Sequence, residues 1–461
     1  MFSKETYKER RRKLLKSVDK GLILLLGNDE SPMNYADNGY HFRQDSTFLY
    51  FFGLNKPFLA GILDCDSGEV SIFGNELTVE DFVWMGPQPS IAAQGLQVGI
   101  TKSGNIASLV TFLKEALSLG REIHFLPPYR PENKIKLFEW LNILPNESMA
   151  KASVELIMGV VNQRNYKSAE EVSEIHIACD ISVEIHKMAM RMAKPGVCEA
   201  HIAATVEQIA LAAGGHVSFP VIATINGQTL HNHYHGNFLK DGEMFLLDAG
   251  AETSMGYAGD LSSTVPVNGK FSSWQKDIYS ICLDSHNTAI SMLKPGIPFK
   301  EVHFESARVI IRGLKDIGLM RGSVDDALTN GAHALFFPCG LGHMMGLDAH
   351  DMEDLGEVYV GYEAEVKSTQ FGLKSLRLAR KLEPGFVITI EPGIYFIPEL
   401  IDQWNAENHN GDYINFDKVI QYKKFGGLRN EENFLITDTG SELLGRPKPK
   451  SISDVEAEWQ L

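Results

Sequence analysis

The sequence predicts an α/β fold in two domains, and three observations lead to this prediction. The chain has 461 residues, which is long for a single core, and its 44% hydrophobic and 22% charged residues are typical of a soluble globular protein. Residues 20–75 alternate short apolar runs with turns, whereas a long amphipathic helical pattern starts near residue 163. Beyond it, one layout of turn, apolar strand and acid occurs twice. We place the domain boundary near residue 163.

The N-terminal part begins with a basic helical segment, "YKERRRKLL", that leads into the apolar run Leu22–Leu26. This run is too short for a signal peptide and lacks a small-residue cleavage site, so we expect a helix followed by a buried strand. The segments "FLYFFG" and "AGILDCDSGEVSIFG" are expected to form further strands, and residues 105–150 to add helices and strands. Together these elements predict an α/β layer.

Charge and cysteine content restrict the functional classes. Lys and Arg together number 43 against 59 Asp and Glu, a net charge of −16, and no long basic block interrupts this balance. A partner with a phosphate backbone requires such a basic surface, so we expect no nucleic acid to bind. No segment is long and apolar enough to span a bilayer, so we expect no membrane association. Five scattered cysteines without paired spacing favour a reducing, cytoplasmic location.

The second part of the chain contains an internal repeat. "MAKPGV" starts at Met192 and "MLKPGI" at Met292, each where a helical run meets a Pro-Gly turn. "LKDGEMFLLDAG" (Leu239–Gly250) and "LEPGFVITIEPG" (Leu382–Gly393) then share a turn, a glycine, an apolar strand and an acid at the same offsets. Turns of this kind are common before strands, but two matching copies predict two halves of similar build. We therefore expect a pseudo-twofold domain whose acids meet in the middle.

The acids at these strand ends require positively charged partners. Asp248 and Asp260 border one predicted hairpin, and burying a carboxylate without a partner is costly. The local sequence supplies no positive charge. Other acids and imidazoles stand beside further apolar runs or glycine-rich loops, and each of them alone is more often a hydrogen-bonded or solvated side chain. Taken together, the candidate ligands are Asp248, Asp260, Glu391, Glu431, His343 and His350.

Four carboxylates with one or two imidazoles are enough to hold two divalent ions that share bridging carboxylates. Oxygen-rich coordination with a single imidazole and no thiolate favours Mn²⁺, and Co²⁺ or Zn²⁺ would also fit. We therefore interpret the partner of the two aspartates as a pair of divalent metal ions.

Several motifs, in this order along the chain, resemble the aminopeptidase P/prolidase branch of the pita-bread metallopeptidases. They are "DAG…Y…GDLSSTVPVNGKF", "GLGHMMGLDAHD", "EPGIYF" and "GGLRNEEN", and "FRQDSTFLYFFG" (Phe42–Gly53) resembles the N-terminal domain of the same branch. The resemblance covers nearly the whole chain, and the set is far more specific than any one motif. It implies a creatinase-like α/β domain over residues 1–162, a pita-bread catalytic domain over residues 163–461, and a homodimer or dimer of dimers.

The resemblance also implies a role for each ligand. Asp248 would chelate one ion, and Asp260 and Glu431 would bridge both ions. His343 and Glu391 would complete the coordination of the other ion. Glu391 would also handle protons while water attacks the scissile carbonyl.

Two further active-site histidines are implied. His350, seven residues after His343, matches the histidine that steadies the tetrahedral intermediate, and His231 in "TLHNHYHGN" matches the other. Three histidines crowd this stretch. We choose His231 because of its spacing to Asp248 and because a leucine directly precedes it, and we keep His233 as the alternative.

Two other residues lie beside the predicted ligands. Arg429, two residues before Glu431, is expected to orient that carboxylate, and a surface arginine in a loop is the alternative. Cys339 stands where relatives usually carry a histidine, four residues before the metal-binding histidine, so we expect an altered contact in the site. Nothing nearby makes Cys339 a nucleophile, so we expect a buried packing residue.

The resemblance implies a dimetal exopeptidase that cleaves the bond to the proline nitrogen in proline-containing peptides. "FGLKSLRLARKLEPG" resembles the prolidase subgroup, in which the arginine at Arg377 would grip the free carboxylate of an Xaa-Pro dipeptide with its planar fork. Xaa-Pro dipeptidase is the interpretation we favour, and Xaa-Pro aminopeptidase acting on longer peptides is the alternative, with Arg377 as an ordinary basic loop residue. A catalytically inactive binding protein of this fold is disfavoured because every ligand position is filled.

Overall fold

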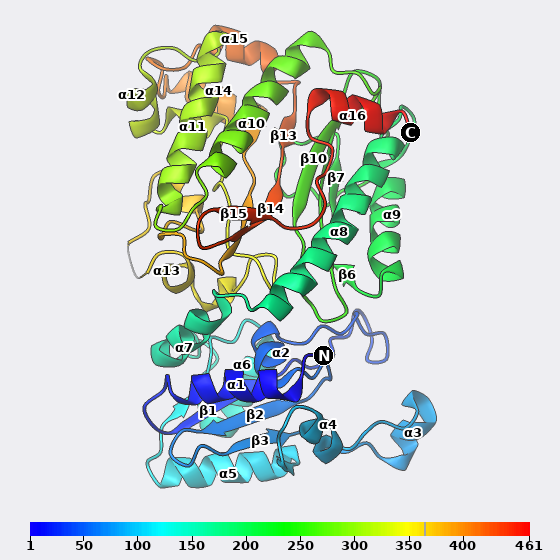
Figure 1. Cartoon of the computed structure of the whole chain (residues 1–461), viewed down its shortest axis with the longest axis vertical. Coiled ribbons are helices and arrows are strands. Elements are labelled where there is room, and N and C mark those ends of the chain that lie inside the picture. The colour runs from blue at the N-terminus through cyan, green and yellow to red at the C-terminus, as the bar shows by residue number, and fades with distance from the viewer. Residues whose placement is uncertain (364–365) are drawn as a thin grey trace. The chain divides into compact units, whose positions relative to one another are not determined.

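The structure, a computed structural model, is described for residues 1–363 and 366–461 and divides into two compact units. Unit 1 comprises Met1–Arg164 and Met352–Tyr359, and unit 2 comprises Asn165–Asp351 and Val360–Leu461. In Figure 1 the first 164 residues run from blue to cyan, and most of unit 2 runs from green to red. Both units combine helices and strands, so the predicted α/β class is confirmed.

Unit 1 is built on a mixed sheet with the strand order β4-β3-β2-β1-β5. Its strands are β1 (Leu22–Leu26), β2 (Ala60–Asp64), β3 (Val70–Phe73), β4 (Lys102–Gly104) and β5 (Ile123–His124). Strand β2 is antiparallel to β1 and β3, whereas β5 is parallel to β1 and β4 is parallel to β3. The sheet therefore cannot be a simple meander, and helices supply its crossovers.

The helices of unit 1 lie around this sheet. They are α1 (Lys4–Leu15), α2 (Ser46–Phe52), α3 (Val79–Met85), α4 (Ile91–Gln97), α5 (Ile106–Ser118), α6 (Pro131–Leu141) and α7 (Val154–Arg164). Leu22 and Leu24 of β1 share one buried cluster with Leu109 and Leu113 of α5 and Leu137 of α6. The predicted basic helix followed by a buried strand is confirmed as α1 and β1.

The prediction of a strand over "FLYFFG" is wrong, because this segment forms helix α2. The carboxylate of Asp45 accepts a hydrogen bond from the backbone N–H of Phe48 at 2.8 Å, which caps the start of the helix. Gly53 ends it in the left-handed region with a φ of 65°. Phe48, Phe51 and Phe52 are all fully buried, so the continuous apolar run reflects burial on every side of a short helix.

Unit 2 contains most of the remaining elements. The helices include α8 (Ala169–Met192), α9 (Glu199–Ala212), α10 (Ser273–Ser291), α11 (Phe299–Asp316), α12 (Val324–Thr329), α14 (Pro398–Ala406), α15 (Phe416–Val419) and α16 (Ile452–Trp459). The strands are β6 (His216–Val217), β7 (Ile222–Thr224), β8 (Met244–Ala249), β9 (Ala251–Glu252), β10 (Leu261–Pro266), β11 (Val387–Ile390), β12 (Gly393–Tyr395), β13 (Gly427–Arg429), β14 (Glu432–Ile436) and β15 (Ser441–Leu443). Within residues 1–363 and 366–461, none of the helices combines the length and apolar character that crossing a bilayer requires.

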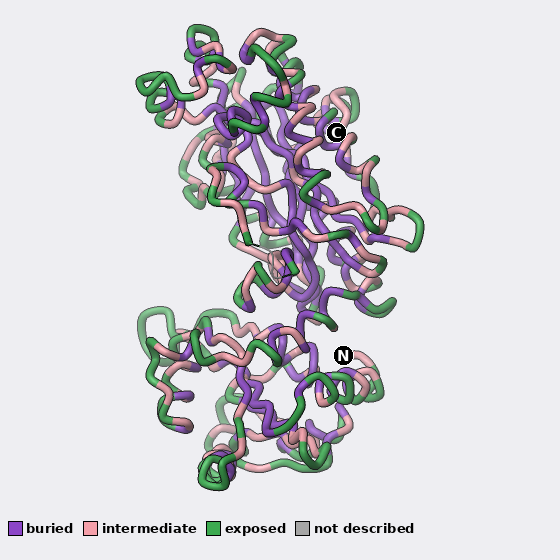
Figure 2. The backbone as a smooth tube through the Cα atoms, turned by 90° about the vertical axis from the view of Figure 1, so that its left-hand side faces the viewer, coloured by how far each residue is buried: buried purple, intermediate pink, exposed green. Residues whose placement is uncertain are grey.

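The strands of unit 2 form the centre of a layered arrangement. Helix α8 packs on β8 and β10, and α9 packs on β7, whereas α10 packs on β11, β12 and β13. In Figure 1 the labelled strands β7, β10 and β13 lie between the α8–α9 pair and the α10–α11 pair. Figure 2 shows the buried backbone of this unit concentrated in its middle, and β8, β10 and β11 are buried at every residue. Residues at the strand ends therefore lie inside the unit.

The backbone confirms the predicted internal repeat, because both copies make the same pair of hydrogen bonds. The N–H of Gly196 in "MAKPGV" donates to the carbonyl of Leu239 at 2.8 Å, and the N–H of Leu239 returns a bond to Val197 at 2.9 Å. In the second copy Gly296 donates to the carbonyl of Leu382 at 2.8 Å, and Leu382 donates to Ile297 at 2.9 Å. Each Pro-Gly turn thus fixes the start of its own acid-bearing strand segment.

Candidate metal centre

The first repeat places two aspartates side by side. Asp248 is the last but one residue of β8, and Asp260 directly precedes β10. The two strands are antiparallel, and Ser262 is paired with Asp248 in their register. Asp248 is 8% exposed and Asp260 is 5% exposed, so both carboxylates are buried at one end of the hairpin.

The second repeat delivers two glutamates to the same place. Glu391 directly follows β11, and Glu431 lies between β13 and β14. The backbone N–H of Glu431 donates to the carbonyl of Ser262 at 3.1 Å, which joins the second repeat to β10 of the first. The acids of both halves therefore meet in the interior, as the repeat predicts. We call Asp248, Asp260, Glu391 and Glu431 the carboxylate cluster.

His343 points one ring nitrogen at this cluster. Its backbone is held by Thr389 of β11, which accepts from the His343 N–H through its hydroxyl at 3.1 Å. The ring Nδ1 lies 3.0 Å from the carbonyl of Met344, a contact that places the proton on Nδ1. The other ring nitrogen, Nε2, lies 3.6 Å from Asp260 Oδ2 and 3.5 Å from Glu391 Oε1. An imidazole held in this way presents a lone pair to a metal ion.

The donor set fits divalent cations. Ligand atoms of Asp260, His343 and Glu431 all lie within 4.8 Å of one another. Oδ1 of Asp248 is buried and has no hydrogen-bond partner among the described residues. Such an unsatisfied buried oxygen is costly unless an ion or a water completes its bonding. Oxygen ligands with one imidazole are the set that hard and intermediate divalent ions accept.

The titration of the cluster supports the same conclusion. Burial, followed by the charges of Asp248 and Glu391, raises the pKa of Asp260 well above its ordinary value. Burial, followed by the charge of Asp260, does the same to the pKa of Glu431. Burial raises the pKa of Glu391 to about 7, although the charge of Arg429 opposes it. Without cations the cluster therefore retains protons that divalent ions would displace.

Arg429 is the cation that the chain itself places beside the cluster. This side chain at the end of β13 is 4% exposed and donates from its guanidinium to Asp248 Oδ2. The same guanidinium donates to the Ser262 hydroxyl at 2.9 Å and to the Tyr395 hydroxyl at 2.7 Å. The Ser262 hydroxyl in turn donates to Glu431 Oε2 at 2.8 Å. Arg429 thus reaches Glu431, its expected partner, through Ser262, and it contacts Asp248 directly.

The two predicted histidines outside the ligand set also face the cluster. The rings of His343 and His350 pack edge to face with centroids 4.4 Å apart. Burial and the charge of Arg429 lower the pKa of His231, and the charges of Asp248 and His350 also act on it. These charges place His231 near the cluster, although His231 is exposed, as His233 is; His235 Nε2 lies 3.0 Å from the carbonyl of Val221.

Arg377 and Cys339 border Glu391, whose side chain is 20% exposed. The positive charge of Arg377, a half-buried residue, opposes the burial that raises the pKa of Glu391, so this arginine lies near Glu391. Burial and the charge of Glu391 raise the pKa of the Cys339 thiol to about 12, and a hydrogen bond with Tyr395 opposes this shift. The thiol is therefore neutral at physiological pH, which fits the expectation that it is not a nucleophile.

Sequence reasoning missed three residues that hold the candidate ligands in place. Besides Ser262 and Tyr395, the side chain of Asn433 accepts from the Asp260 N–H at 3.0 Å and donates to the Asp260 carbonyl at 2.7 Å. Ser262 and Asn433 each follow a ligand by two residues, which puts them on the same face of the strand. This period of two is a signal that could have identified both of them.

Residues 173–438 match metallopeptidase family M24, and residues 7–124 match the aminopeptidase P, N-terminal domain. The chain is 30% identical to the Xaa-Pro dipeptidase of Homo sapiens over 95% of this chain and 88% of that one. It is 29% identical to the Xaa-Pro aminopeptidase of Escherichia coli K12 over 99% and 98% of the two chains.

Solved structures extend the likeness to the fold. The structure of Pseudomonas aeruginosa aminopeptidase PepP has a TM-score of 0.81 at 27% identity and covers 100% of this chain and 98% of its own. A zinc-substituted Escherichia coli aminopeptidase P in complex with product has a TM-score of 0.80 at 27% identity, with the same coverage of both chains. The resemblance therefore extends over both units.

Proposed function

The chain belongs to metallopeptidase family M24, and we propose that it is an exopeptidase that hydrolyses Xaa-Pro bonds in proline-containing peptides. The observation that carries this proposal is the buried carboxylate cluster beside His343. Each repeat contributes two of its acids. Relatives named Xaa-Pro dipeptidase and Xaa-Pro aminopeptidase align over nearly the full chain. These two activities differ only in the length of the peptide substrate. An inactive protein of this family would have no reason to retain the complete donor set.

We propose that two divalent ions bind per subunit, with Mn²⁺ as the physiological metal and Co²⁺ or Zn²⁺ as alternatives. Asp248 would hold one ion, Asp260 and Glu431 would bridge, and His343 with Glu391 would hold the other. The predominance of oxygen ligands supports Mn²⁺. When bound, such ions supply Lewis acidity that polarises a carbonyl and acidifies water.

The side chains around the cluster have separate proposed tasks. Glu391 would accept a proton from the attacking water and pass it to the leaving proline nitrogen, a role that its raised pKa of about 7 supports. His350 and His231 would donate hydrogen bonds to the oxygen that becomes negatively charged as water adds to the carbonyl. Arg429 would keep Asp248 and, through Ser262, Glu431 in the orientation that ligation requires.

We propose Xaa-Pro dipeptidase as the specific activity, with Arg377 binding the free carboxylate of the dipeptide. The proximity of Arg377 to Glu391 supports this assignment, because a dipeptide carboxylate would lie two bonds beyond the scissile amide nitrogen. A panel of substrates with Mn²⁺ tests it. A dipeptidase would hydrolyse Ala-Pro faster than Ala-Pro-Ala, and the reverse preference would make the protein an Xaa-Pro aminopeptidase. Failure to hydrolyse either peptide while metal is bound would favour a binding protein.

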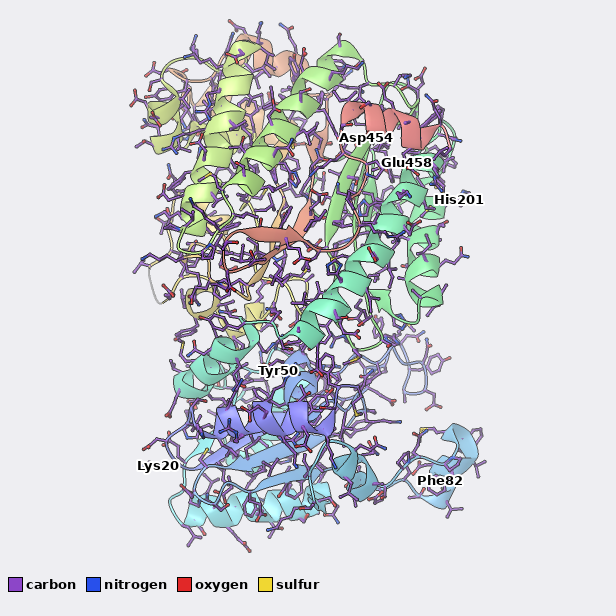
Figure 3. The ribbon with its side chains drawn as sticks, in the orientation of Figure 1. Lys20, Tyr50, Phe82, His201, Asp454 and Glu458 are labelled. Atoms are coloured by element: carbon purple, nitrogen blue, oxygen red, sulfur yellow. The ribbon has the colours of Figure 1, made fainter. Side chains whose placement is uncertain are left out.

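We further propose a homodimer or dimer of dimers in the cytoplasm, without a nucleic-acid or membrane partner. Helix α3 supports self-association, because Val79, Val83 and Trp84 are 79%, 75% and 82% exposed. Phe82, labelled in Figure 3, lies on this helix at the outer end of a projection from unit 1. Five cysteines without a disulfide among them support a reducing compartment. Sedimentation of the purified protein would give the subunit number.

A further inference from the structure

A buried ion pair lies at the base of the loop that carries both site histidines. Lys167 Nζ donates to Asp351 Oδ2 at 2.9 Å, and each side chain is only 1% exposed. Replacing a buried ion pair by apolar side chains of similar volume is often neutral or stabilising. Stability alone therefore does not explain why the chain uses these two residues, whereas their positions between site segments suggest a role in the site.

Both members of the pair are fixed by their backbones to the segments that carry metal ligands. The N–H of Lys167 donates to the carbonyl of Gly385 at 2.8 Å, at the turn that starts the segment of β11 and Glu391. The N–H of Asp351 donates to the carbonyl of Met344, the residue after His343, at 3.0 Å. The ion pair thus connects the end of the histidine-bearing loop to the turn that precedes β11 in the second repeat.

The loop itself, residues 343–351, is closed around this pair. The N–H of Gly346 donates to the carbonyl of Asp348 at 3.0 Å, and its carbonyl accepts from Ala258 at 2.8 Å. A Cβ on Gly346 would lie 2.8 Å from both Asp351 Oδ2 and Lys167 Cε, so the ion pair packs directly against the Gly346 backbone. A side chain at this position would displace the pair or the loop.

His350 is therefore held on both sides along the chain. Before it, the turn at Gly346 is closed by hydrogen bonds, and after it Asp351 is fixed through both its backbone and its carboxylate. Met352 follows with a φ of 60°, a left-handed conformation that a residue with a side chain adopts only when its surroundings impose it. The imidazole of His350 lies against His343 at the carboxylate cluster.

We infer that Lys167 and Asp351 are positioning residues for the reaction, which act by fixing the backbone that presents the His350 imidazole to the substrate. This inference rests on the proposed function. In this assignment the pair acts through His350 and not on the substrate directly. A misplacement of a reacting group by about 1 Å can slow an enzyme about 100-fold, so loss of this anchor lowers kcat.

The test uses the double variant Lys167→Met/Asp351→Leu in the full chain, because it removes the two charges of the pair together. Leu has the branched shape of Asp. We expect kcat for the better of Ala-Pro and Ala-Pro-Ala to fall about 10-fold to 100-fold, with KM within about threefold of the wild type. Metal content and the unfolding midpoint should not change. Lys167→Arg, which keeps the charge pair, should restore kcat to within a few-fold of the wild type.

The decisive readout is a double-mutant cycle with His350→Ala. If the pair acts through His350, removing the pair in the His350→Ala background should change kcat by less than about twofold, since interacting residues are not additive. The same large factor in both backgrounds, or unchanged kcat in the double variant, would overturn the inference. If Lys167→Met/Asp351→Leu does not fold, Asp351→Asn, which removes the carboxylate charge, provides the same cycle in both backgrounds.

A matched control is the ion pair at the other end of α8. Arg191 lies 2.5 Å from Glu458 of α16, which is labelled in Figure 3. Helix α8 has 24 residues, so its two ends are about 36 Å apart. Arg191→Met/Glu458→Leu should leave kcat unchanged, and a loss equal to that of the Lys167 and Asp351 variant would also contradict the inference. A wild-type protein that hydrolyses no Xaa-Pro peptide would instead refute the proposed function.

Discussion

The substitution Arg429→Met tests the electrostatic balance of the carboxylate cluster. In the protein without metal, Oδ1 of Asp248 has no partner among the described residues, and Oδ2 accepts from Arg429. Removing one member of a buried ion pair costs about 3–5 kcal/mol. An unpaired buried carboxylate can escape by taking up a proton, which costs about 1.4 kcal/mol for each pH unit above its ordinary pKa of about 3.9, or about 4 kcal/mol at pH 7. The two estimates agree.

We therefore expect the metal-free Arg429→Met protein to lose about 4 kcal/mol of unfolding free energy at pH 7 and about 2 kcal/mol at pH 5.5, because uptake of a proton becomes less costly as the pH falls. Urea unfolding after chelation measures this difference. Saturating Mn²⁺ should reduce the loss, because bound cations compensate Asp248 in place of the guanidinium. Lys151→Met, which removes an exposed ion pair with Glu147, is the control and should cost less than about 1 kcal/mol. A loss below about 1 kcal/mol for Arg429→Met, or a loss independent of pH, would refute this reasoning.

Further substitutions separate ligands from the other site residues. Asp260→Asn should abolish turnover and reduce bound metal, because an amide cannot supply a bridging charge; activity within a few-fold of the wild type would remove Asp260 from the ligand set. His350→Ala should lower kcat about 100-fold or more with unchanged metal content, as should His231→Ala, whereas His233→Ala should have little effect; metal loss in either of the first two would make that histidine a ligand. Arg377→Ala should raise KM for Ala-Pro by an amount worth about 2–4 kcal/mol and scarcely affect Ala-Pro-Ala, and equal effects on both would favour the aminopeptidase. Because Asp260, Glu391 and Glu431 have raised pKa values and must lose protons to bind ions, metal affinity measured by titration should fall as the pH decreases through about 7, while the metal-free protein becomes more stable; affinity that is flat from pH 8 to pH 6 would contradict this.

The site could be predicted from the sequence to the extent that its residues follow regular elements. Asp248 and Glu391 stand at equal offsets in two copies of one strand pattern, so their convergence follows from pseudo-twofold symmetry. The structure brings both copies together through Ser262 and Glu431. A repeat constrains position because both halves must bury the same apolar faces against each other.

Contacts between distant segments could not be predicted in this way. Arg429 was expected to orient Glu431, its neighbour in sequence, yet its guanidinium contacts Asp248, 181 residues away. Lys167 and Asp351 are separated by 184 residues, and no local pattern marks either one. Side-chain pairs of this kind depend on how the strands and loops pack, which periodicity does not encode.

The error at "FLYFFG" has a related cause. A short run that is apolar at every position fits both a strand and a fully buried helix, because neither leaves a polar face to reveal its period. The capping contact of Asp45 with Phe48 and the left-handed Gly53 decide in favour of the helix. The sequence "DSTFLYFFG" contains both signals, an N-cap aspartate before the run and a glycine after it, so helix-boundary rules could have corrected the prediction.

The central claim is that the carboxylate cluster and His343 hold divalent ions for the hydrolysis of Xaa-Pro bonds. The most direct measurement is a titration of the chelated, full-length protein with Mn²⁺ that records bound metal and hydrolysis of Ala-Pro and Ala-Pro-Ala in the same samples. The account predicts that activity on at least one of these peptides is absent without metal and rises with Mn²⁺ until two ions are bound per subunit. A protein that binds no divalent ion, or that binds two and cleaves neither peptide, would contradict it.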